Sequence, residues 1–299
     1  MSFTIASTVD EAVAAMAAGA RPIAGGSDLV VGARQGKGSL PDDLVAIDRL
    51  AELASVDRRP AGVRIGALVT HARLMTDEIV LADATGVADA AALVGSPATR
   101  NVGTVGGNIM NGSPAMDTGA PLLTLGAEVE LRSSGGSRTV PIGQLWTGPG
   151  ATAAAVDELC VGIDIPPAPG RDGSAYVRLE YRRAMEIAVV GAAASVALAD
   201  DGTVALARVA LTAVAPTIIE VGGVSDLCDG RAPAACLGPV ADAASAAATP
   251  ISDLRATDEY RRHTVGVMAR RAFDAAARRA AGESIPVPVN RALGIGEAL

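Results

Sequence analysis

Hydrophobic residues recur with two different periods along this chain, which predicts a protein built from both helices and strands. Over 8–20 the apolar positions have helical spacing, with Thr8 or Asp10 available as the N-terminal cap and Gly19 as the stop. From 127 to 132 apolar and charged residues alternate strictly, which is typical of a strand with one buried face.

Glycine-containing turns predict two hairpins. Gly135-Gly136 leads the strand at 127–132 into another at 138–142, and Asp200-Asp201-Gly202 joins strands at 188–199 and 204–214. Other short apolar runs predict strands at 21–24, 44–48, 63–67 and 175–180. Helical spacing predicts helices or helical turns at 29–35, 72–76, 80–94, 117–125 and 258–281, whereas the Gly- and Asn-rich stretch 95–112 predicts a loop system.

The composition favours a folded protein that does not bind nucleic acid. Apolar residues make up 49% of the 299 residues, which is enough for a large core and for two domains. A net charge of −8 and an aromatic content of 2% argue against a nucleic-acid surface, which needs clustered positive charge and stacking platforms.

Few residues are available to bind metals or form disulfides. The three cysteines contain no C-x-x-C pair, so neither a disulfide scaffold nor an iron–sulfur cluster within this chain is expected. Of the two histidines, His71 is expected to cap or pack against a helix start, and His263 is expected to be exposed on a polar helix.

No segment has the features of a membrane anchor or a leader. The start of the chain lacks a basic and an apolar leader region. The longest uncharged apolar run, Ile187–Ala199, is too short to cross a bilayer and predicts a buried segment. We therefore expect a cytoplasmic protein that is not an integral membrane protein.

Three familiar site motifs are absent from the sequence. There is no G-x-G-x-x-G, no G-x-x-x-x-G-K-[ST] and no G-x-S-x-G, so a Rossmann nucleotide site, a P-loop and a serine hydrolase elbow are not supported.

A glycine-rich turn, Ala24-Gly25-Gly26-Ser27-Asp28, stands between a predicted strand and a helical turn. Glycines allow backbone N–H groups to approach an anion closely, and a helix start adds partial positive charge. Ser27 can cap that helix or donate to a phosphate. Alternatively, the motif is an ordinary tight turn.

A longer glycine-rich stretch begins at Arg100 and runs to Asp117. Successive N–H groups in such a loop can form a concave anion site, to which Thr104, Asn108 and Ser113 add neutral donors. Asp117 can accept from ribose hydroxyls or cap the next helix. A purely structural glycine loop is the alternative. Two anion sites in one chain fit one ligand with two phosphates, held by backbone dipoles rather than by lysines.

The sequences AGGSDL at 24–29 and RNVGTVGGNIMNGSPAMDTGAPLLTLGA at 100–127 resemble the FAD-binding medium subunit of the molybdenum hydroxylases, the family of carbon monoxide dehydrogenase and xanthine dehydrogenase. The resemblance extends to about Gly282. It implies an α+β fold: a two-subdomain FAD-binding domain of the vanillyl-alcohol-oxidase (PCMH) type, followed by a C-terminal α/β domain. The corresponding boundaries are 1–170 (subdomains about 1–55 and 56–170), 171–282, and an extended tail at 283–299.

The resemblance also implies which residues bind FAD. Ala24, Gly25, Gly26, Ser27 and Asp28 would wrap the pyrophosphate, with Thr104, Gly106, Gly107 and Asn108 on its other side. Asn111 and Asp117 would hold the ribityl or ribose region. The segment containing Tyr176–Arg178 and Arg182–Ile187 would lie beside the flavin ring, with Arg178 as a nearby cation and Ile187 packed against the ring. Alternatively, Ile187 simply begins a buried strand.

In enzymes of the resembled family, a molybdopterin-containing large subunit oxidises the substrate and a small subunit carries two [2Fe–2S] clusters. The resemblance therefore implies an FAD-carrying electron-transfer subunit that serves an external acceptor such as a quinone or NAD, in a heterotrimer that dimerises. The alternatives are a stand-alone FAD-dependent oxidoreductase and a scaffold subunit without FAD. A further expectation is that the tail docks against a partner.

Overall fold

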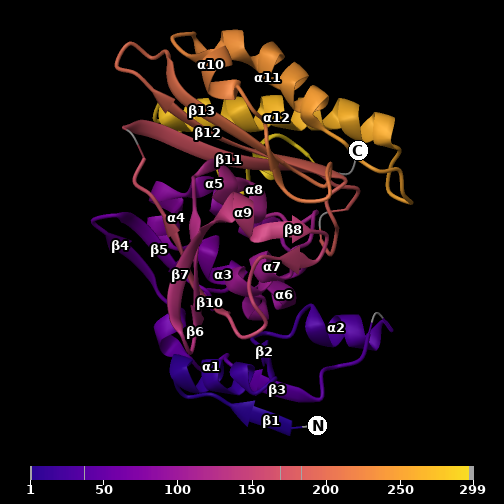
Figure 1. The fold of residues 1–299 in the computed structure, drawn as a ribbon. Coiled ribbons are helices and arrows are strands. Elements are labelled where there is room, and N and C mark those ends of the chain that lie inside the picture. Colours follow the sequence, from indigo (N-terminus) through magenta and orange to yellow (C-terminus); the bar gives the residue numbers. More distant parts are fainter. Residues whose placement is uncertain (1, 37, 169, 183, 296–299) are drawn as a thin grey trace.

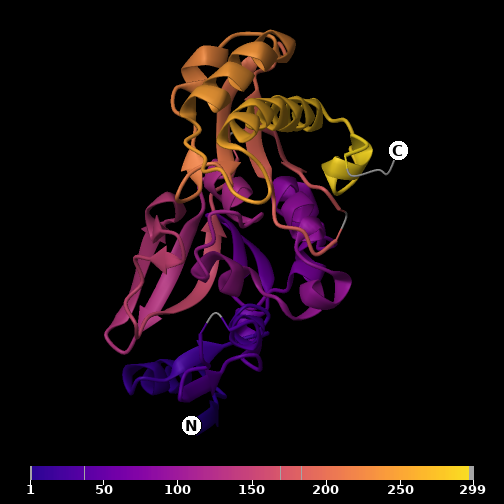
Figure 2. The same cartoon turned by 90° about the vertical axis from the view of Figure 1, so that its right-hand side faces the viewer.

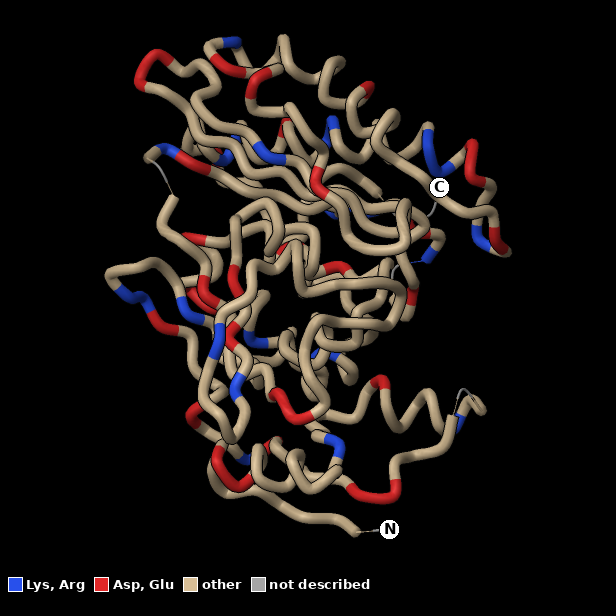
Figure 3. The backbone as a smooth tube through the Cα atoms, in the orientation of Figure 1, with Lys and Arg blue, Asp and Glu red and all other residues tan. Residues whose placement is uncertain are grey.

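The hydrophobic residues gather in three cores, which the computed structural model stacks as three tiers along one axis (Figure 1). The structure describes residues 2–36, 38–168, 170–182 and 184–295. Acidic and basic positions are interspersed along the backbone of all three tiers (Figure 3), and many of them form pairs, such as Arg58 with Asp83 and Arg64 with Asp164.

The N-terminal tier is a small parallel sheet of order β1-β3-β2 with a helix packed on it. Its elements are β1 (Ser2–Ile5), α1 (Val9–Ala17), β2 (Arg21–Ile23), α2 (Leu29–Arg34) and β3 (Asp43–Ala46). α1 begins where predicted, because the Thr8 side chain accepts a hydrogen bond from Glu11 N at 3.2 Å, and the Glu11 carboxylate accepts from Ser7 N at 2.7 Å.

The middle tier is an antiparallel sheet of order β4-β5-β10-β6-β7 with short helices beside it. Its strands are β4 (Val56–Arg59), β5 (Gly62–Gly66), β6 (Glu128–Ser133), β7 (Gly136–Pro141) and β10 (Leu159–Ile165), with a small hairpin of β8 (Trp146–Gly148) and β9 (Ala151–Thr152). Its helices are η1 (Ala51–Leu53), α3 (His71–Leu74), α4 (Glu78–Asp83), α5 (Thr85–Leu93), α6 (Pro97–Val102), α7 (Val105–Met110), α8 (Gly119–Thr124) and α9 (Ile142–Leu145).

The C-terminal tier is an antiparallel sheet covered by helices on its outer face, while α5 and α8 lie beneath it (Figure 1). It comprises β11 (Arg171–Leu179), β12 (Val190–Leu198), β13 (Val204–Thr212), β14 (Ile219–Glu220), α10 (Val224–Cys228), α11 (Pro233–Ala247), α12 (Asp258–Ala280) and α13 (Val289–Ala292). α12 approaches β11 so closely that a Cβ on Gly173 would lie 2.4 Å from the Ala276 carbonyl oxygen.

Most of the predicted elements are confirmed, including α1, β2, β3, both hairpins and α12. The prediction of a loop at 95–112 is wrong, because this stretch forms the two short helices α6 and α7. Ser96 caps α6, with Pro97 as its first residue, and Thr104 caps α7. The helix predicted at 80–94 is two helices that meet at Ala84.

The mixed α and β fold expected from the sequence is confirmed, with one correction to its C-terminal part. The expected α/β domain has an antiparallel sheet whose main helices follow the strands, so its class is α+β. Within the described residues, no helix is both long and apolar enough to cross a membrane.

The described part of the tail is packed against the rest of the chain, which corrects the extended arm predicted for 283–299. After α12 the chain turns down toward α5 (Figure 2). Buried Asn290 accepts from Arg178 N at 3.0 Å and donates to Arg178 O at 2.9 Å, and Val289 N donates to the Asp89 carboxylate at 3.0 Å. Residues 296–299 lie outside the described part.

Candidate functional site

The two glycine-rich motifs, which are far apart in the chain, lie against each other in the structure. A Cβ on Gly25 would lie only 1.8 Å from the carbonyl oxygen of Val102, at the end of α6. Glycine is therefore required at position 25 for this close approach. Asn111 and Asp28 make a second contact, with Asn111 Nδ2 at 3.4 Å from Asp28 Oδ1. We call the region where these motifs meet the two-loop seam.

The first motif presents three consecutive backbone N–H groups that have no acceptor among the described residues. The N–H groups of Gly25, Gly26 and Ser27 make no hydrogen bond to any described residue. Gly26 adopts a φ of +65°, which turns the chain from β2 into α2. Ser27 does not cap α2, because Asp28 occupies the N-cap position. α2 is only six residues long, so we attribute the anion-binding potential to the open N–H groups rather than to a helix dipole.

The second motif is held on the segment 67–71 by successive backbone hydrogen bonds. Gly106 N donates to Ala67 O at 2.9 Å, Val105 N to Val69 O at 3.0 Å, and His71 N to Gly103 O at 3.1 Å. The Gly106 N–H, a predicted phosphate donor, is therefore already engaged. A Cβ on Gly106 would lie 2.7 Å from Ala67 O, so this glycine is needed for packing.

α7 starts at the buried cap Thr104, and Gly107 is the exposed residue of its first turn. Thr104 Oγ1 accepts from Gly107 N at 3.2 Å, which caps the helix. Gly107 is exposed, and a Cβ there would lie 3.1 Å from Thr104 Oγ1. The Asn108 side chain accepts from Thr118 Oγ1 at 2.6 Å and so ties α7 to the start of α8.

Behind this helix, Asp117 and Arg178 form a buried ion pair that joins the middle and C-terminal tiers. Arg178 is fully buried, and its Nη1 donates to Asp117 at 2.7 Å. Its Nε donates to Glu180 Oε2 at 2.8 Å, and its Nη2 lies 2.6 Å from the same oxygen. Tyr176 OH donates to the other Asp117 oxygen at 2.8 Å. Both carboxylate oxygens of Asp117 are thus engaged, and Asp117 does not cap α8.

Within this cluster, the surroundings of Arg178 and Tyr176 keep both side chains protonated near neutral pH. Burial lowers the pKa of Arg178, but Asp117 and Glu180 outweigh burial, so the pKa is raised overall. Burial, and then the negative charge of Asp117, raises the pKa of Tyr176 well above its ordinary value. Tyr176 therefore remains a protonated donor to Asp117.

The segment between β11 and β12 exposes apolar side chains. Tyr181, Met185 and Ile187 are 60%, 58% and 54% exposed, so Ile187 does not begin a buried strand as one sequence interpretation held. Met185 N donates to Gly95 O at 3.1 Å, which places this segment beside the start of α6. Arg183 of the predicted flavin-ring segment lies outside the described residues.

His71 lies beside Gly103 of the second motif, although it belongs to neither glycine motif. As predicted, it packs at a helix start: it is the first residue of α3 and is 2% exposed. Burial, and then the nearby Arg100, lowers the pKa of His71 to about 4. His263 is exposed on α12, as predicted. In the sequence, the placement of His71 at a helix start was indicated by Thr70, which directly precedes it and caps α3.

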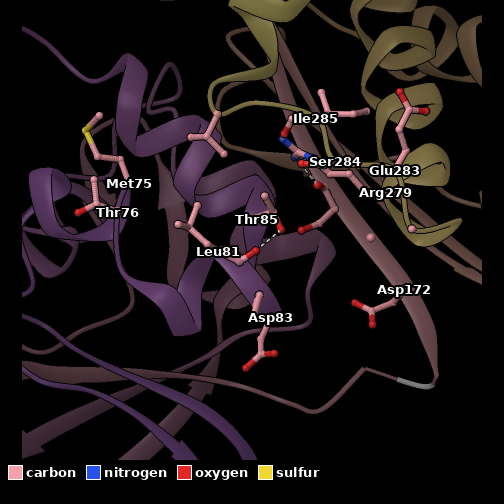
Figure 4. Close-up of a pocket in the computed structure, with 15 residues that line it drawn as sticks. Met75, Thr76, Leu81, Asp83, Thr85, Asp172, Arg279, Glu283, Ser284 and Ile285 are labelled. Atoms are coloured by element: carbon pink, nitrogen blue, oxygen red, sulfur yellow. Dashed lines mark hydrogen bonds between the residues drawn. The ribbon is translucent and has the colours of Figure 1, made fainter.

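A separate pocket of about 590 Å³ lies between the middle tier and the C-terminal tier (Figure 4). Its charged residues include Asp83, which pairs with Arg58, and Arg279, which pairs with buried Asp89. It contains none of the predicted site residues, and we assign it no role.

The chain matches two family models and several characterised proteins. A model described as "FAD binding domain in molybdopterin dehydrogenase" matches residues 1–168, and one described as "CO dehydrogenase flavoprotein C-terminal domain" matches residues 175–276. The xanthine dehydrogenase FAD-binding subunit of Escherichia coli O157:H7 is 32% identical over 88% of this chain and 91% of the relative. The carbon monoxide dehydrogenase medium chain of Hydrogenophaga pseudoflava is 35% identical over 81% of this chain and 84% of the relative.

The fold agrees with a solved structure of the same kind. A chain in the structure of carbon monoxide dehydrogenase from Hydrogenophaga pseudoflava superimposes with a TM-score of 0.88 at 32% identity, covering 93% of this chain and 98% of that chain.

Proposed function

Because this chain belongs to the family of FAD-binding flavoprotein subunits of the molybdenum hydroxylases, we propose that it binds FAD at the two-loop seam and serves as the electron-transfer subunit of such an enzyme. Family membership makes the chain a flavoprotein oxidoreductase subunit, as its motifs predicted.

The described residues fit the phosphate portion of FAD. The observation that carries the proposal is the contact of Gly25 with Val102, which brings both glycine motifs together beside the open N–H groups of Gly25, Gly26 and Ser27. Open N–H groups in a turn are suited to an anion such as pyrophosphate. In the second motif, Gly107 is exposed and lacks a side chain, so we propose that the pyrophosphate also lies against Gly107.

Each predicted site residue takes a proposed role according to its environment. Residues 24–28 would hold the pyrophosphate, with Gly107 beside it. Thr104, Gly106 and Asn108 would shape α7, because their polar groups are engaged within the protein. Exposed Asn111 would meet the ribityl or ribose region.

Two further groups of residues complete this assignment. Asp117 and Arg178 would act as positioning residues behind the loop, because they are paired with each other and buried. Ile187, Met185 and Tyr181 would provide the apolar surface for the flavin ring, because all three side chains are exposed.

When bound, FAD supplies the redox chemistry, and the protein supplies position and electrostatics. We propose that the chain receives electrons from [2Fe–2S] clusters of a small partner subunit and passes them to an external acceptor such as a quinone or NAD. A molybdopterin-containing large subunit would oxidise the substrate, in a heterotrimer that dimerises. In support, the three cysteines of this chain are buried, which leaves the clusters to a partner.

We also propose a division of the chain into a FAD-binding domain at 1–170 and a C-terminal flavoprotein domain at 171–282. The FAD-binding domain would be of the vanillyl-alcohol-oxidase (PCMH) type, with subdomains at about 1–55 and 56–170. In support, each of the three cores draws most of its residues from one of these segments, although Tyr176, Ala193, Ala210 and Ile218 of the C-terminal segment belong to the middle core.

Purification of the untagged protein from its native cell, with mass spectrometry of the chains that accompany it, tests the proposed partnership. The expected result is two partner chains and an absorption spectrum in which iron–sulfur bands overlie flavin bands. Flavin bands on a lone chain would contradict the partnership and favour a stand-alone FAD-dependent oxidoreductase. A spectrum without flavin would contradict the FAD assignment itself.

A further inference from the structure

His71 lies at the two-loop seam, although neither glycine motif contains it. The position that a Cβ of Gly103 would take is 3.3 Å from His71 Cδ2 and 3.5 Å from Ser27 Oγ. His71 Cδ2 and the Ser27 hydroxyl therefore both lie near one point of the seam, together with Thr99 O, which is 3.0 Å from that point and accepts from Gly103 N. The Ser27 hydroxyl makes no hydrogen bond to another described residue.

The two nitrogens of the His71 ring have different surroundings. Nδ1 is buried and has no hydrogen-bond partner among the described residues. A neutral imidazole carries one proton, on Nδ1 or on Nε2. A proton on Nδ1 would create a buried donor without an acceptor, which is the rarer kind of unpaired buried group. The proton is therefore assigned to Nε2, which is bonded to Cδ2 on the edge that faces Gly103 and Ser27.

The charged groups around His71 are consistent with a neutral ring at pH 7. α5 and α6 pack against α3. On α6, Arg100 opposes protonation of the ring, whereas Asp89 on α5 is bound by Arg279. On α3 itself, Arg73 pairs with Asp77.

We propose that His71 Nε2–H and the Ser27 hydroxyl donate together to a phosphate oxygen of the bound FAD. His71 is then a cofactor-binding residue in addition to its packing role. The inference rests on the proposed function, because the phosphate belongs to FAD. Hydrogen bonds from such donors to an anionic oxygen are among the stronger ones in proteins.

Two matched variants separate donation from packing. His71→Gln places an amide nitrogen near the position of Nε2 and keeps a donor, whereas His71→Leu fills similar space without one. FAD would be titrated into the full-length, cofactor-free chain. The signal would be the fluorescence of its single tryptophan, Trp146, whose Nε1 donates to Ile109 O in α7 at 2.9 Å.

The expected result is that His71→Leu weakens FAD affinity by about tenfold or more, while His71→Gln loses about threefold or less. Affinity of His71→Leu equal to the wild type would overturn the proposal. Equal weakening by both variants would also overturn it, because the ring would then act by packing alone. Failure of the wild-type chain to bind FAD would instead contradict the proposed function.

NMR of the histidine rings in the wild-type chain tests the proposal even if the variants do not fold. The chain has two histidines, so ¹⁵N-histidine labelling gives few ring signals, and His263 serves as an internal control. We expect the Nε2–H form of His71 at pH 7 and a shift of that signal, but not that of His263, on addition of FAD. A proton on Nδ1, or a His71 signal that FAD does not shift, would overturn the proposal.

Discussion

Gly25 and Val102 lie in such close contact that only glycine fits at position 25. A Cβ there would be 1.8 Å from the Val102 carbonyl oxygen. Backbone must move to admit even one methyl group at this point. The glycine of the first motif thus has a specific partner in the second motif, and the geometry of the seam depends on both.

Gly25→Ala is therefore expected to weaken FAD binding by roughly tenfold to a hundredfold, because the methyl group forces the two loops apart. FAD titration of the purified chain measures this effect. Gly32→Ala is the matched control, because a Cβ on Gly32 in α2 meets nothing within 4 Å. Undiminished FAD affinity in Gly25→Ala would argue against binding at the seam.

Neighbouring glycines in α7 are expected to respond in opposite ways. Gly106→Ala brings a Cβ to 2.7 Å from Ala67 O and should lower the free energy of unfolding by about 1–3 kcal/mol. Gly107→Ala adds a methyl group on an exposed helical position and should leave the free energy of unfolding unchanged or raise it by up to about 1 kcal/mol. It should nevertheless weaken FAD binding.

Chemical denaturation of the cofactor-free chain, followed by FAD titration, distinguishes these two effects. If Gly107→Ala binds FAD as tightly as the wild type, Gly107 does not face the cofactor.

The buried pair of Asp117 and Arg178 is expected to be important for stability. Asp117→Ala leaves the fully buried Arg178 with Glu180 alone and should lower the free energy of unfolding by about 3–5 kcal/mol. Glu283→Gln, which removes a charge from the exposed pair with Arg278, should leave it nearly unchanged. If both variants lowered the free energy of unfolding by a similar, small amount, the buried pair would not join the two tiers.

His71 is expected to make stability depend on pH. Its pKa falls from 6.5 to about 4 in the folded chain, so between these values the unfolded chain binds more protons than the folded one. The free energy of unfolding should therefore decrease as the pH falls from 6.5 to 4, by at most about 3 kcal/mol from this residue.

Urea unfolding across this pH range tests the expectation. The difference between wild type and His71→Gln should show the dependence, while His263→Gln should behave like the wild type. If the free energy of unfolding changed with pH in the same way in the wild type and in His71→Gln, His71 would not be the source of the pH dependence.

Local sequence patterns predicted much of the fold because they report which face of an element is buried. The alternation at 127–132 and the Asp200–Gly202 turn correctly indicated β6 and the hairpin between β12 and β13. α6 and α7 were missed because the glycine-rich composition of this stretch indicated a loop. The helix caps Ser96 and Thr104, which indicate helices, were given less weight. β1 was missed because its four residues are all exposed and have no buried face.

The site could be predicted only in part, because contacts between distant segments leave little trace in local sequence. The two motifs and the resemblance to a family were evident from the residues, and the family models confirm that resemblance. The engagement of the Gly106 N–H by Ala67, the burial of Asp117 with Arg178, and the position of His71 all depend on tertiary packing. No spacing of residues in the sequence encodes these contacts.

Whether the two-loop seam holds FAD is measured most directly by denaturing the complex purified from its native cell and determining the amount of FAD released per copy of this chain. We expect about one FAD per chain for the wild type and a marked loss in Gly25→Ala, while Gly32→Ala should keep the wild-type content. Absence of FAD from the wild type, or full FAD content in Gly25→Ala, would contradict the claim that the two glycine motifs together form the cofactor site.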